Sequence, residues 1–282
     1  MMNKSKILTI LVRMLAVSLW SGLLPAGAQQ PATPPSSPGA AAQTSPSAVP
    51  PPGGRGGGRG GANRYQPPTG PAPRMADGKI DFSGNWAPNA INENVDLAKV
   101  IGDPPMLPWA DKLYRERKGS LSKDDPEGYC LPPGVPRMST TPYPWTMIQT
   151  DKLLVIVYEG GAHIWRKIFL DGRPHNPQVV ETWLGDSLGH WQDNDTLIVE
   201  TVGQTDKTWL DESGLPHTKD MVVTEQFKRT DLGHMEIVHT INDPGAYSKP
   251  WTFTTHPTML NGELIEYICQ ENNRDVQHLV GK

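Results

Sequence analysis

From about residue 146 onward, hydrophobic and polar residues alternate with a period of two, the pattern of half-buried β-strands. Turn-forming pairs such as Gly160-Gly161, Asp193-Asn194 and Asn261-Gly262 separate the alternating segments. One short strand is expected before this region. The predicted strands are residues 81–86, 146–149, 153–159, 163–170, 179–184, 196–202, 221–228, 235–241, 251–256 and 264–269.

The connections between these strands are short and helix is nearly absent, which predicts an all-β, antiparallel meander. So many strands in one domain either close into a barrel or stack as two sheets. Because closure removes exposed edges, we expect a lipocalin-like barrel, with a β-sandwich as the alternative. One short helix is predicted at 108–118, where Pro108 suits the first helical position and Gly119 the stop.

Two titratable residues interrupt apolar faces of neighbouring strands. Glu225 shares a face with Met221, Val223 and Phe227 in one strand, and His239 lies among Met235, Ile237 and Ile241 in the next. Matching the two apolar faces in a hairpin pairs Phe227 with Ile237, Val223 with Ile241, and Glu225 with His239. Directly opposed side chains lie within hydrogen-bond reach, so we expect a buried Glu–His pair.

Arg166 lies on the apolar face of its strand with Ile164 and Ile168, so it needs a buried acidic partner. Glu159, Glu200, Glu225 and Glu266 are the candidates. The functional interpretation is a lumen in which Arg166 holds an anionic or carbonyl oxygen while Glu225 and His239 transfer a proton, as in a cofactor-independent lyase, hydratase or isomerase. The alternative is a structural polar network in a carrier or a cell-envelope interaction protein.

Other residues could line a ligand cavity. Trp86, Trp183 and Trp251 fall in predicted strands, although core packing alone would explain them. The long connection 203–220 carries Trp209 and His217, and long loops at a barrel rim are commonly lids or binding loops. The predicted ligand-binding residues are Trp86, Glu159, Trp183, Trp209, His217 and Trp251, around a small organic molecule.

The segment GDSLG (residues 185–189) has the G-x-S-x-G spacing of a serine hydrolase, and Asp275 and His278 follow as a D-x-x-H pair. A nucleophile elbow needs a strand, a sharp turn and a helix. Here a turn and another predicted strand follow, with no βαβ unit nearby. A serine esterase at Ser187 is therefore a third interpretation, disfavoured by its context.

The N-terminal part predicts export. Basic residues flank and interrupt an apolar run that ends at Ala26-Gly27-Ala28, an A-x-A cleavage site, so residues 1–28 are predicted to be a signal peptide. Residues 29–76 are rich in proline and glycine and are predicted to be a disordered linker, which leaves 77–282 as the β-domain. A periplasmic or secreted protein without a membrane span after signal cleavage is expected, in an oligomeric state that the sequence leaves open.

Charge and motifs exclude several partners. All 30 acidic residues lie from Asp77 onward, whereas seven of the 26 basic residues precede it, which leaves the β-domain with a net charge of −11. Such a domain repels phosphate backbones, so nucleic acid is not expected as a partner, and the Arg-Gly repeats near residue 55 are interpreted as spacer. Neither a metal motif nor a glycine-rich phosphate loop appears, so no cofactor is predicted.

Cys130 and Cys269 are the two cysteines. In an exported protein an even number usually indicates a disulfide, here closing a loop of about 140 residues. Two buried thiols are the alternative.

Several phrases together resemble a large, functionally uncharacterised family of exported bacterial β-rich, lipocalin-like proteins. They are Cys130-Leu-Pro-Pro-Gly-Val-Pro-Arg137, Asp171-Gly-Arg173, Gly185-Asp-Ser-Leu-Gly-His-Trp191 followed by Asp195-Thr-Leu, Asn242-Asp-Pro244 and Glu266-Tyr-Ile-Cys269. The resemblance spans nearly the whole β-domain and implies an exported β-rich protein without specifying its chemistry. Where the family often has His-Glu-Gly-Asn after the second cysteine, this sequence has Gln270-Glu-Asn-Asn273.

Overall fold

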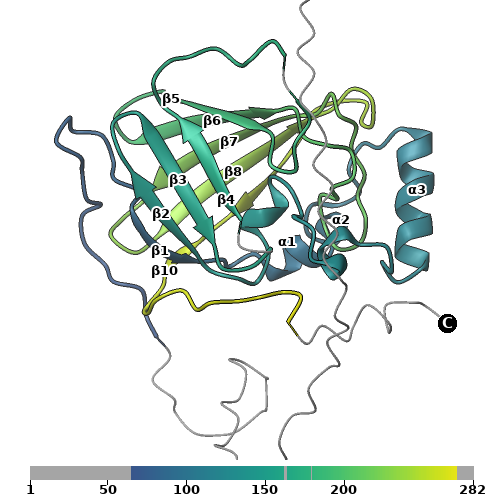
Figure 1. Ribbon diagram of the computed structural model, residues 1–282, viewed down its shortest axis with the longest axis horizontal. Coiled ribbons are helices and arrows are strands. Elements are labelled where there is room, and N and C mark those ends of the chain that lie inside the picture. Colours follow the sequence, from purple (N-terminus) through teal and green to yellow (C-terminus); the bar gives the residue numbers. More distant parts are fainter. Residues whose placement is uncertain (1–64, 162–163, 179, 272–282) are drawn as a thin grey trace, which may run out of the picture. The chain divides into compact units, whose positions relative to one another are not determined.

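The computed structural model describes residues 65–161, 164–178 and 180–271 (Figure 1), all within the compact unit Gly61–Lys282. The predicted signal peptide, residues 29–64 of the predicted linker, and the Asp275–His278 pair lie outside the described residues. Residues 65–76 are described, and they already contact the β-domain, because Leu232 N donates to Gly70 O.

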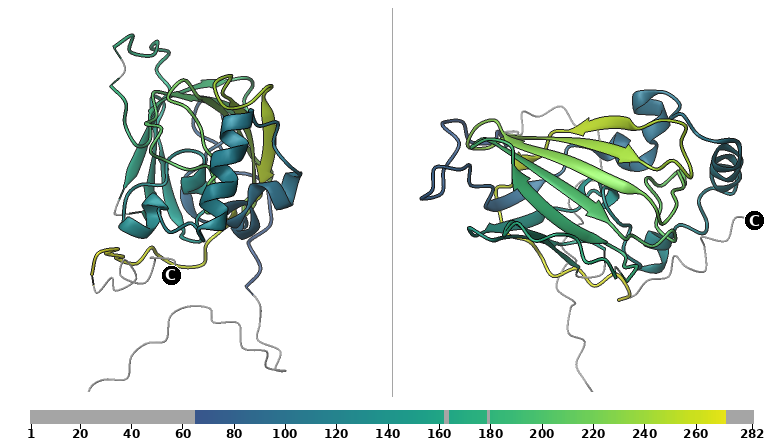
Figure 2. Two further views of the ribbon diagram at one scale, coloured as in Figure 1. Left: turned by 90° about the vertical axis from the view of Figure 1, so that its right-hand side faces the viewer. Right: turned by 90° about the horizontal axis from the view of Figure 1, so that it is seen from above.

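One ten-stranded sheet forms the domain, in the order β10-β1-β2-β3-β4-β5-β6-β7-β8-β9. The sheet curls into a half-barrel (Figures 1 and 2), so the all-β, barrel-like prediction is confirmed and no second stacked sheet is formed by the described residues. Its strands are β1 (Gly84–Ala87), β2 (Trp145–Gln149), β3 (Leu153–Tyr158), β4 (Trp165–Phe169), β5 (Asp186–Trp191), β6 (Thr196–Val202), β7 (Val222–Arg229), β8 (Met235–Asn242), β9 (Trp251–Thr255) and β10 (Thr258–Met259).

The two ends of the sheet meet at β10. This strand pairs with β1 through Trp86 and Met259, and Met259 N also donates to Gly233 O in the turn before β8. Thr258 forms a bridge with His234 in the same turn. The chain that leaves β9 therefore links the last strand of the ladder to the first, which draws the curled sheet together at this end.

One neighbouring pair departs from the predicted antiparallel meander. β4 and β5 are parallel, with Ile168 opposite Ser187 and Phe169 opposite Leu188. Of the predicted strand 179–184, the described residues 180–184 form only an isolated bridge at Thr182, and they are part of the crossing that two parallel neighbours require. Residues 186–191, for which no strand was predicted, form β5.

The helices gather at one end of the sheet (Figure 2). The predicted helix is confirmed as α3 (Pro108–Gly119), with Pro108 in its first turn. The prediction of a single helix is wrong, because two short helices, α1 (Ile91–Val95) and α2 (Leu97–Ile101), precede it. Two 3-10 turns, η1 (Pro126–Tyr129) and η2 (Arg137–Ser139), follow it. The short helices and 3-10 turns could not be predicted because their polar, proline-rich sequences have little hydrophobic periodicity.

Buried hydrophobic residues form two clusters. The strand-side cluster contains Phe82, Trp86, Trp145, Leu154, Ile156, Leu197, Val199, Phe227 and Ile237. The helix-side cluster contains Leu97, Ala110, Tyr114, Leu210, Leu215, Val223, Ile241, Tyr247, Trp251 and Phe253. Along β7 the chain passes from Phe227 in the first cluster, through Glu225, to Val223 in the second. A polar position therefore separates the two clusters on this strand.

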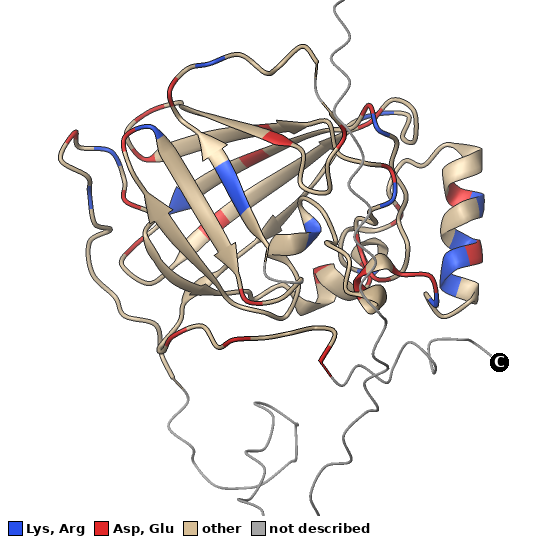
Figure 3. Ribbon diagram, in the orientation of Figure 1, with Lys and Arg blue, Asp and Glu red and all other residues tan. Residues whose placement is uncertain are grey.

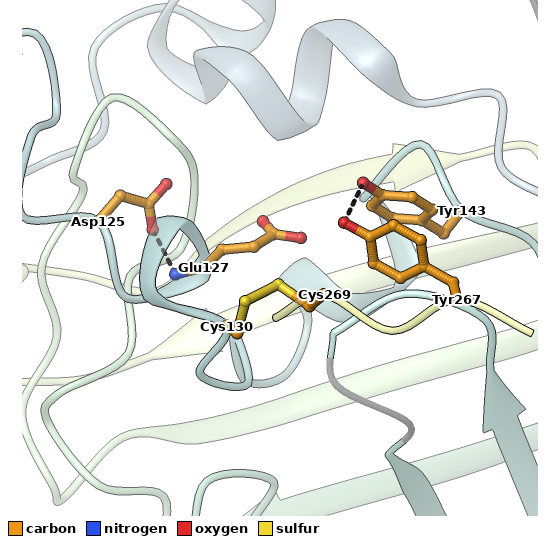
Figure 4. Close-up of a disulfide and its surroundings, with 6 residues drawn as sticks. All are labelled: Asp125, Glu127, Cys130, Tyr143, Tyr267 and Cys269. Carbon is orange, nitrogen blue, oxygen red and sulfur yellow. Dashed lines mark hydrogen bonds between the residues drawn. A yellow bond between two sulfur atoms is a disulfide. The ribbon is translucent and has the colours of Figure 1, made fainter. Parts of the chain in front are cut away.

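The predicted disulfide between Cys130 and Cys269 is confirmed, and it joins the end of η1 to the segment after β10 (Figure 4). The predicted strand 264–269 does not form. Ile265 N donates instead to the side chain of Glu159 at 2.8 Å, and the disulfide ties down the far end of the segment. A side-chain hydrogen bond and a disulfide, instead of sheet hydrogen bonds, therefore hold this segment to the domain.

Candidate functional site

The hairpin register predicted from the apolar faces is confirmed. Glu225 is paired with His239, flanked by Phe227 with Ile237 and Val223 with Ile241. Both polar side chains are fully buried, and His239 Nδ1 lies 3.3 Å from Glu225 Oε1. On its other edge the His239 ring contacts Thr255 Oγ1 through Nε2 at 3.0 Å.

Arg166 completes this pair from the opposite side of the half-barrel. Its Nη2 donates to Glu225 Oε2 at 2.5 Å, so Glu225 is the acidic partner among the four predicted candidates. Glu159 accepts from Ile265, and Glu200 is half-exposed, 3.3 Å from the His175 ring. Glu266 is exposed.

Hydroxyl groups surround the guanidinium. Arg166 Nε donates to Ser187 Oγ at 3.0 Å and Nη2 donates to Thr201 Oγ1 at 2.8 Å. The two hydroxyls are themselves 2.9 Å apart. We call Tyr158, Arg166, Ser187, Thr201, Glu225, His239 and Thr255 the polar layer, because all seven are buried in one region between the two hydrophobic clusters.

Sequence reasoning missed three members of the polar layer. Tyr158, Thr201 and Thr255 lie in predicted strands, and the sequence alone assigned no role to them. The period of two contains the signal, since Thr201 shares a face with Leu197 and Val199 in β6. A hydroxyl on an apolar face needs a partner, as a buried charge does.

The charges of the polar layer balance in the buried state. Burial alone would raise the pKa of Glu225, but Arg166 and His239 outweigh that effect and lower this pKa to about 2. Burial alone would likewise lower the pKa of Arg166, but the carboxylate of Glu225 keeps it raised. Glu225 and Arg166 therefore form a permanent buried ion pair at neutral pH.

The Tyr158 hydroxyl interacts with the side chains of Arg166 and Ser139, and burial raises its pKa. Gln204 Nε2 and Trp251 Nε1 are buried donors without a hydrogen-bond acceptor within the described part of the chain.

A pocket of about 520 Å³ reaches this arginine from the barrel wall. It lies between β4 and the segment that leads into β5, where the parallel pairing of the two strands begins only at Ile168. We call it the wall pocket, and its main lining residues are Trp165, Arg166, Phe169, Trp183, Leu184 and Ser187. Figure 3 shows that charged residues are sparse on the strands and more frequent in loops and α3.

Of the predicted ligand-binding tryptophans, Trp183 lines the wall pocket. Trp86 packs in the strand-side cluster, where its indole N–H donates to Phe82 O at 3.0 Å. Trp251 is in the helix-side cluster. Trp165, half-exposed in the wall pocket, was missed because an outward aromatic on an alternating strand carries no sequence signal for a pocket.

The loop 203–220 places its predicted residues away from Arg166. Trp209 is buried under the guanidinium of Arg117, 4.4 Å from the ring centre. His217 is buried, with Nε2 2.6 Å from Thr208 Oγ1 and Nδ1 2.9 Å from Thr218 O, and burial lowers its pKa. Trp209 therefore links the loop to α3, whereas the hydrogen bonds of His217 lie within the loop. Glu159, noted above, also has a structural contact.

Ser187 is not on a nucleophile elbow. It is the second residue of β5, it is buried, and the strand continues to Trp191 with no helix after it. Its hydroxyl contacts Arg166 and Thr201, not a histidine. Gly185 just before β5 has φ +69°, and a Cβ there would lie 2.5 Å from Val202 O, so the motif's first glycine serves this close approach.

A second pocket, of about 420 Å³, lies at the disulfide (Figure 4) and was not foreseen from the sequence. Its walls include Asp125, Glu127, Tyr143 and Tyr267. Beneath it the fully buried Arg137 forms two hydrogen bonds of 2.7 Å with Asp125 and donates to Glu127 at 2.9 Å. Burial, together with nearby Asp125, outweighs Arg137 and raises the pKa of Glu127 to about 7.

The described residues contain no group of three or more His, Cys, Asp or Glu side chains that could hold a metal ion. Among them there is also no helix long and apolar enough to cross a membrane. In comparisons with known proteins, no family model matches this chain and no curated protein is similar to it.

Proposed function

We propose that this protein is an exported small-molecule-binding protein whose ligand occupies the wall pocket. The ligand would place one polar oxygen against Arg166 and its apolar body between Trp165 and Trp183. Ligand sites of this size are commonly apolar clefts with a few convergent polar groups, and the wall pocket has that composition.

The observation that carries the proposal is the state of Arg166. This side chain lines the wall pocket beside Trp165 and Trp183 and is almost fully buried. Its guanidinium is held by Ser187, Thr201 and Glu225, and it also interacts with the Tyr158 hydroxyl. A guanidinium held rigidly by these partners gives the pocket a preorganised polar group beside its aromatic walls.

Export is supported by two features. The N-terminal sequence has the form of a signal peptide. The disulfide between Cys130 and Cys269 persists in oxidising compartments and is rare where thiols are kept reduced. A periplasmic or secreted location is therefore part of the proposal.

A second candidate function is proton transfer on the bound molecule, by a lyase, hydratase or isomerase without a cofactor. It is favoured by the 3.3 Å separation of His239 Nδ1 and Glu225 Oε1. Because the pKa of Glu225 is lowered to about 2, this carboxylate is a weak base, and the proton would be moved by His239. Glu225 would then be a positioning residue for the imidazole.

Binding is tested by a thermal-shift screen of small aromatic and alicyclic compounds on the mature chain, followed by tryptophan-fluorescence titration of each hit. Trp165→Ala and Trp183→Ala should each weaken binding about fivefold or more, because each removes an aromatic wall. The matched control is Trp109→Ala, a half-exposed tryptophan on α3 outside the wall pocket. Equal binding to all three variants, or a screen without hits, contradicts the proposal.

The two candidate functions are separated by following each hit over time by mass spectrometry. Conversion that is lost in His239→Phe while binding and melting temperature persist supports catalysis. A hit that is bound but returned unchanged by the wild-type protein supports a carrier.

A further inference from the structure

We infer that the ligand of the wall pocket is an extended peptide, which pairs with the unpaired edge of β4 as a short added strand. This inference rests on the proposed function, because it uses the same pocket, and it narrows the ligand class. Three features support it: the unpaired backbone of β4 at the pocket, the direction of the backbone that faces it, and the apolar lining between the two.

β4 is paired along its whole length on one edge only. On the β3 side, every residue from Trp165 to Phe169 has a partner in the ladder. On the β5 side, only Ile168 and Phe169 are paired. Trp165, Arg166 and Lys167 therefore have no strand beside them on this edge among the described residues, and all three line the wall pocket.

The peptide groups at this edge point toward the pocket. Tyr158 N donates to Ile164 O at 3.0 Å, so the backbone of Ile164 and of every second residue after it faces β3. The backbone of Trp165 and of Lys167 then faces the opposite edge, where the wall pocket lies. Within the described part of the chain, no backbone hydrogen bond joins either residue to the segment 182–185. Such an edge is a template for an added strand.

The segment that faces this edge does not supply the missing pairing. Thr182 N donates to Gly203 O at 3.0 Å, and Thr182 O accepts from Thr205 N at 2.9 Å, so the backbone of Thr182 points away from β4. Gly185 has φ +69°, which interrupts the extended conformation just before β5. A peptide from outside the domain can supply the pairing to Trp165 without breaking these contacts.

The lining of the pocket selects an apolar peptide. Alternate side chains of an added strand would point outward beside Trp165 and inward beside Ile164 and Leu184. Ile164 and Leu184 pack against the hydrophobic clusters. The charge of Arg166 is already matched by Glu225, so it does not call for an acidic residue. The inward position therefore suits an apolar side chain.

Lys167 leaves this edge accessible. Lysine side chains often protect strand edges from pairing with other chains. Here Lys167 Nζ lies 4.8 Å from the centre of the half-exposed Trp165 ring, so this side chain extends along the outer face of β4 toward the tryptophan. The pocket beside the backbone stays open.

The test uses capped pentapeptides in which threonine alternates with alanine, valine, leucine or phenylalanine. Each is titrated at pH 7.5 against the full mature chain by tryptophan fluorescence, and at least one should bind. The tightest binder is then N-methylated at one residue at a time. Only every second amide of an added strand faces β4, so methylation should weaken binding at least about fivefold at alternate positions and little at the positions between them. Equal effects at all positions overturn the inference.

Failure of the inference is distinguishable from failure of the proposed function. The inference alone is overturned if no pentapeptide binds while a compound from the thermal-shift screen binds and loses affinity in Trp165→Ala and Trp183→Ala. Both are overturned if neither the pentapeptides nor the screened compounds bind.

Two variants at one position test the backbone contact directly. Lys167→Pro and Lys167→Ala both remove the ammonium group, but only proline also removes the N–H that faces the pocket. Proline is tolerated at such an edge, so the variant should fold, as its melting temperature will show. It should bind the tightest pentapeptide at least about threefold more weakly than Lys167→Ala does. Equal binding by the two folded variants refutes strand addition, and if the proline variant does not fold, the N-methyl series on the wild type decides.

Discussion

Arg166 on β4 and Glu225 on β7 form an ion pair between the two hydrophobic clusters of the half-barrel, with both side chains withdrawn from solvent. The strands that carry them are separated in the sheet by β5 and β6, so the pair spans the interior instead of linking neighbours. Each strand is thereby tied to the opposite wall by a contact that exists only in the curled sheet.

Removing one partner of this pair should destabilise the fold strongly. In Glu225→Gln the guanidinium of Arg166 stays buried without its counter-charge, which should cost about 3–5 kcal/mol of the free energy of unfolding. Urea denaturation of the mature chain measures it. The matched control is Glu200→Gln, a half-exposed acid on β6, which should cost less than about 1 kcal/mol. Similar losses in the two variants would refute the buried-charge explanation.

Stability should fall in acid for the same reason. The pKa of Glu225 is lowered from 4.5 to about 2 in the fold, so its contribution is fully present above pH 4.5 and disappears as the pH falls through about 2. Urea midpoints at pH 6, 4 and 3 should decline in the wild type. The decline should be smaller in Glu225→Gln, and an equal decline would assign it to other carboxyls.

Glu127 should act in the opposite direction. Its pKa is raised from 4.5 to about 7, so the fold gives up stability as the pH rises from about 4.5 to 7. Glu127→Gln removes this titration, and the variant should gain stability relative to the wild type between pH 5 and pH 8, by about 1–3 kcal/mol. Chemical denaturation at the two pH values measures the difference. A constant difference at both pH values would show that Glu127 titrates normally.

The disulfide should contribute more than any one contact of the C-terminal segment. Cys130 and Cys269 are 139 residues apart in sequence, and in the chain-entropy model a loop of this length stabilises the fold by about 4–5 kcal/mol. The double variant Cys130→Ser, Cys269→Ser should lose that amount in urea denaturation. Tyr267→Phe, which removes only a hydroxyl contact of 3.4 Å with Tyr143, is the control and should lose less than about 1 kcal/mol.

The period of two made the β7–β8 hairpin predictable, because a one-residue slip would expose an apolar face and a two-residue slip would separate Glu225 from His239. The same alternation predicted that Arg166 is buried in the interior of the sheet and that it needs a carboxylate partner there. It could not choose Glu225 among four acids, since that choice depends on how far the sheet curls. Curling is a property of the whole sheet and is not encoded in one strand.

The β4–β5 region was mispredicted for a local reason. Val179 to Leu184 has strand-like composition, whereas β5 contains Gly189 and His190, which read as turn residues. Packing requires the glycine, since a Cβ at Gly189 would lie 2.5 Å from Leu170 Cδ2. The wall pocket lies at this parallel β4–β5 junction. It could therefore not be predicted from the antiparallel pairs, even though those were predicted correctly. The cluster around Arg137 was missed because its proline-rich segment has no periodicity.

The pairing of Glu225 with His239 has a consequence for how the chain finds its native alignment. Shifting β8 along β7 by two residues would keep every apolar side chain on the buried face, so the hydrophobic pattern alone does not exclude that register. In that register Glu225 would lie opposite Ile237 or Ile241, and Glu225 and His239 would be buried among apolar side chains without each other as partners. The Glu225–His239 pair therefore selects the native register. Hairpins in a shifted register should be less stable and should dissociate before the remaining strands pack against them.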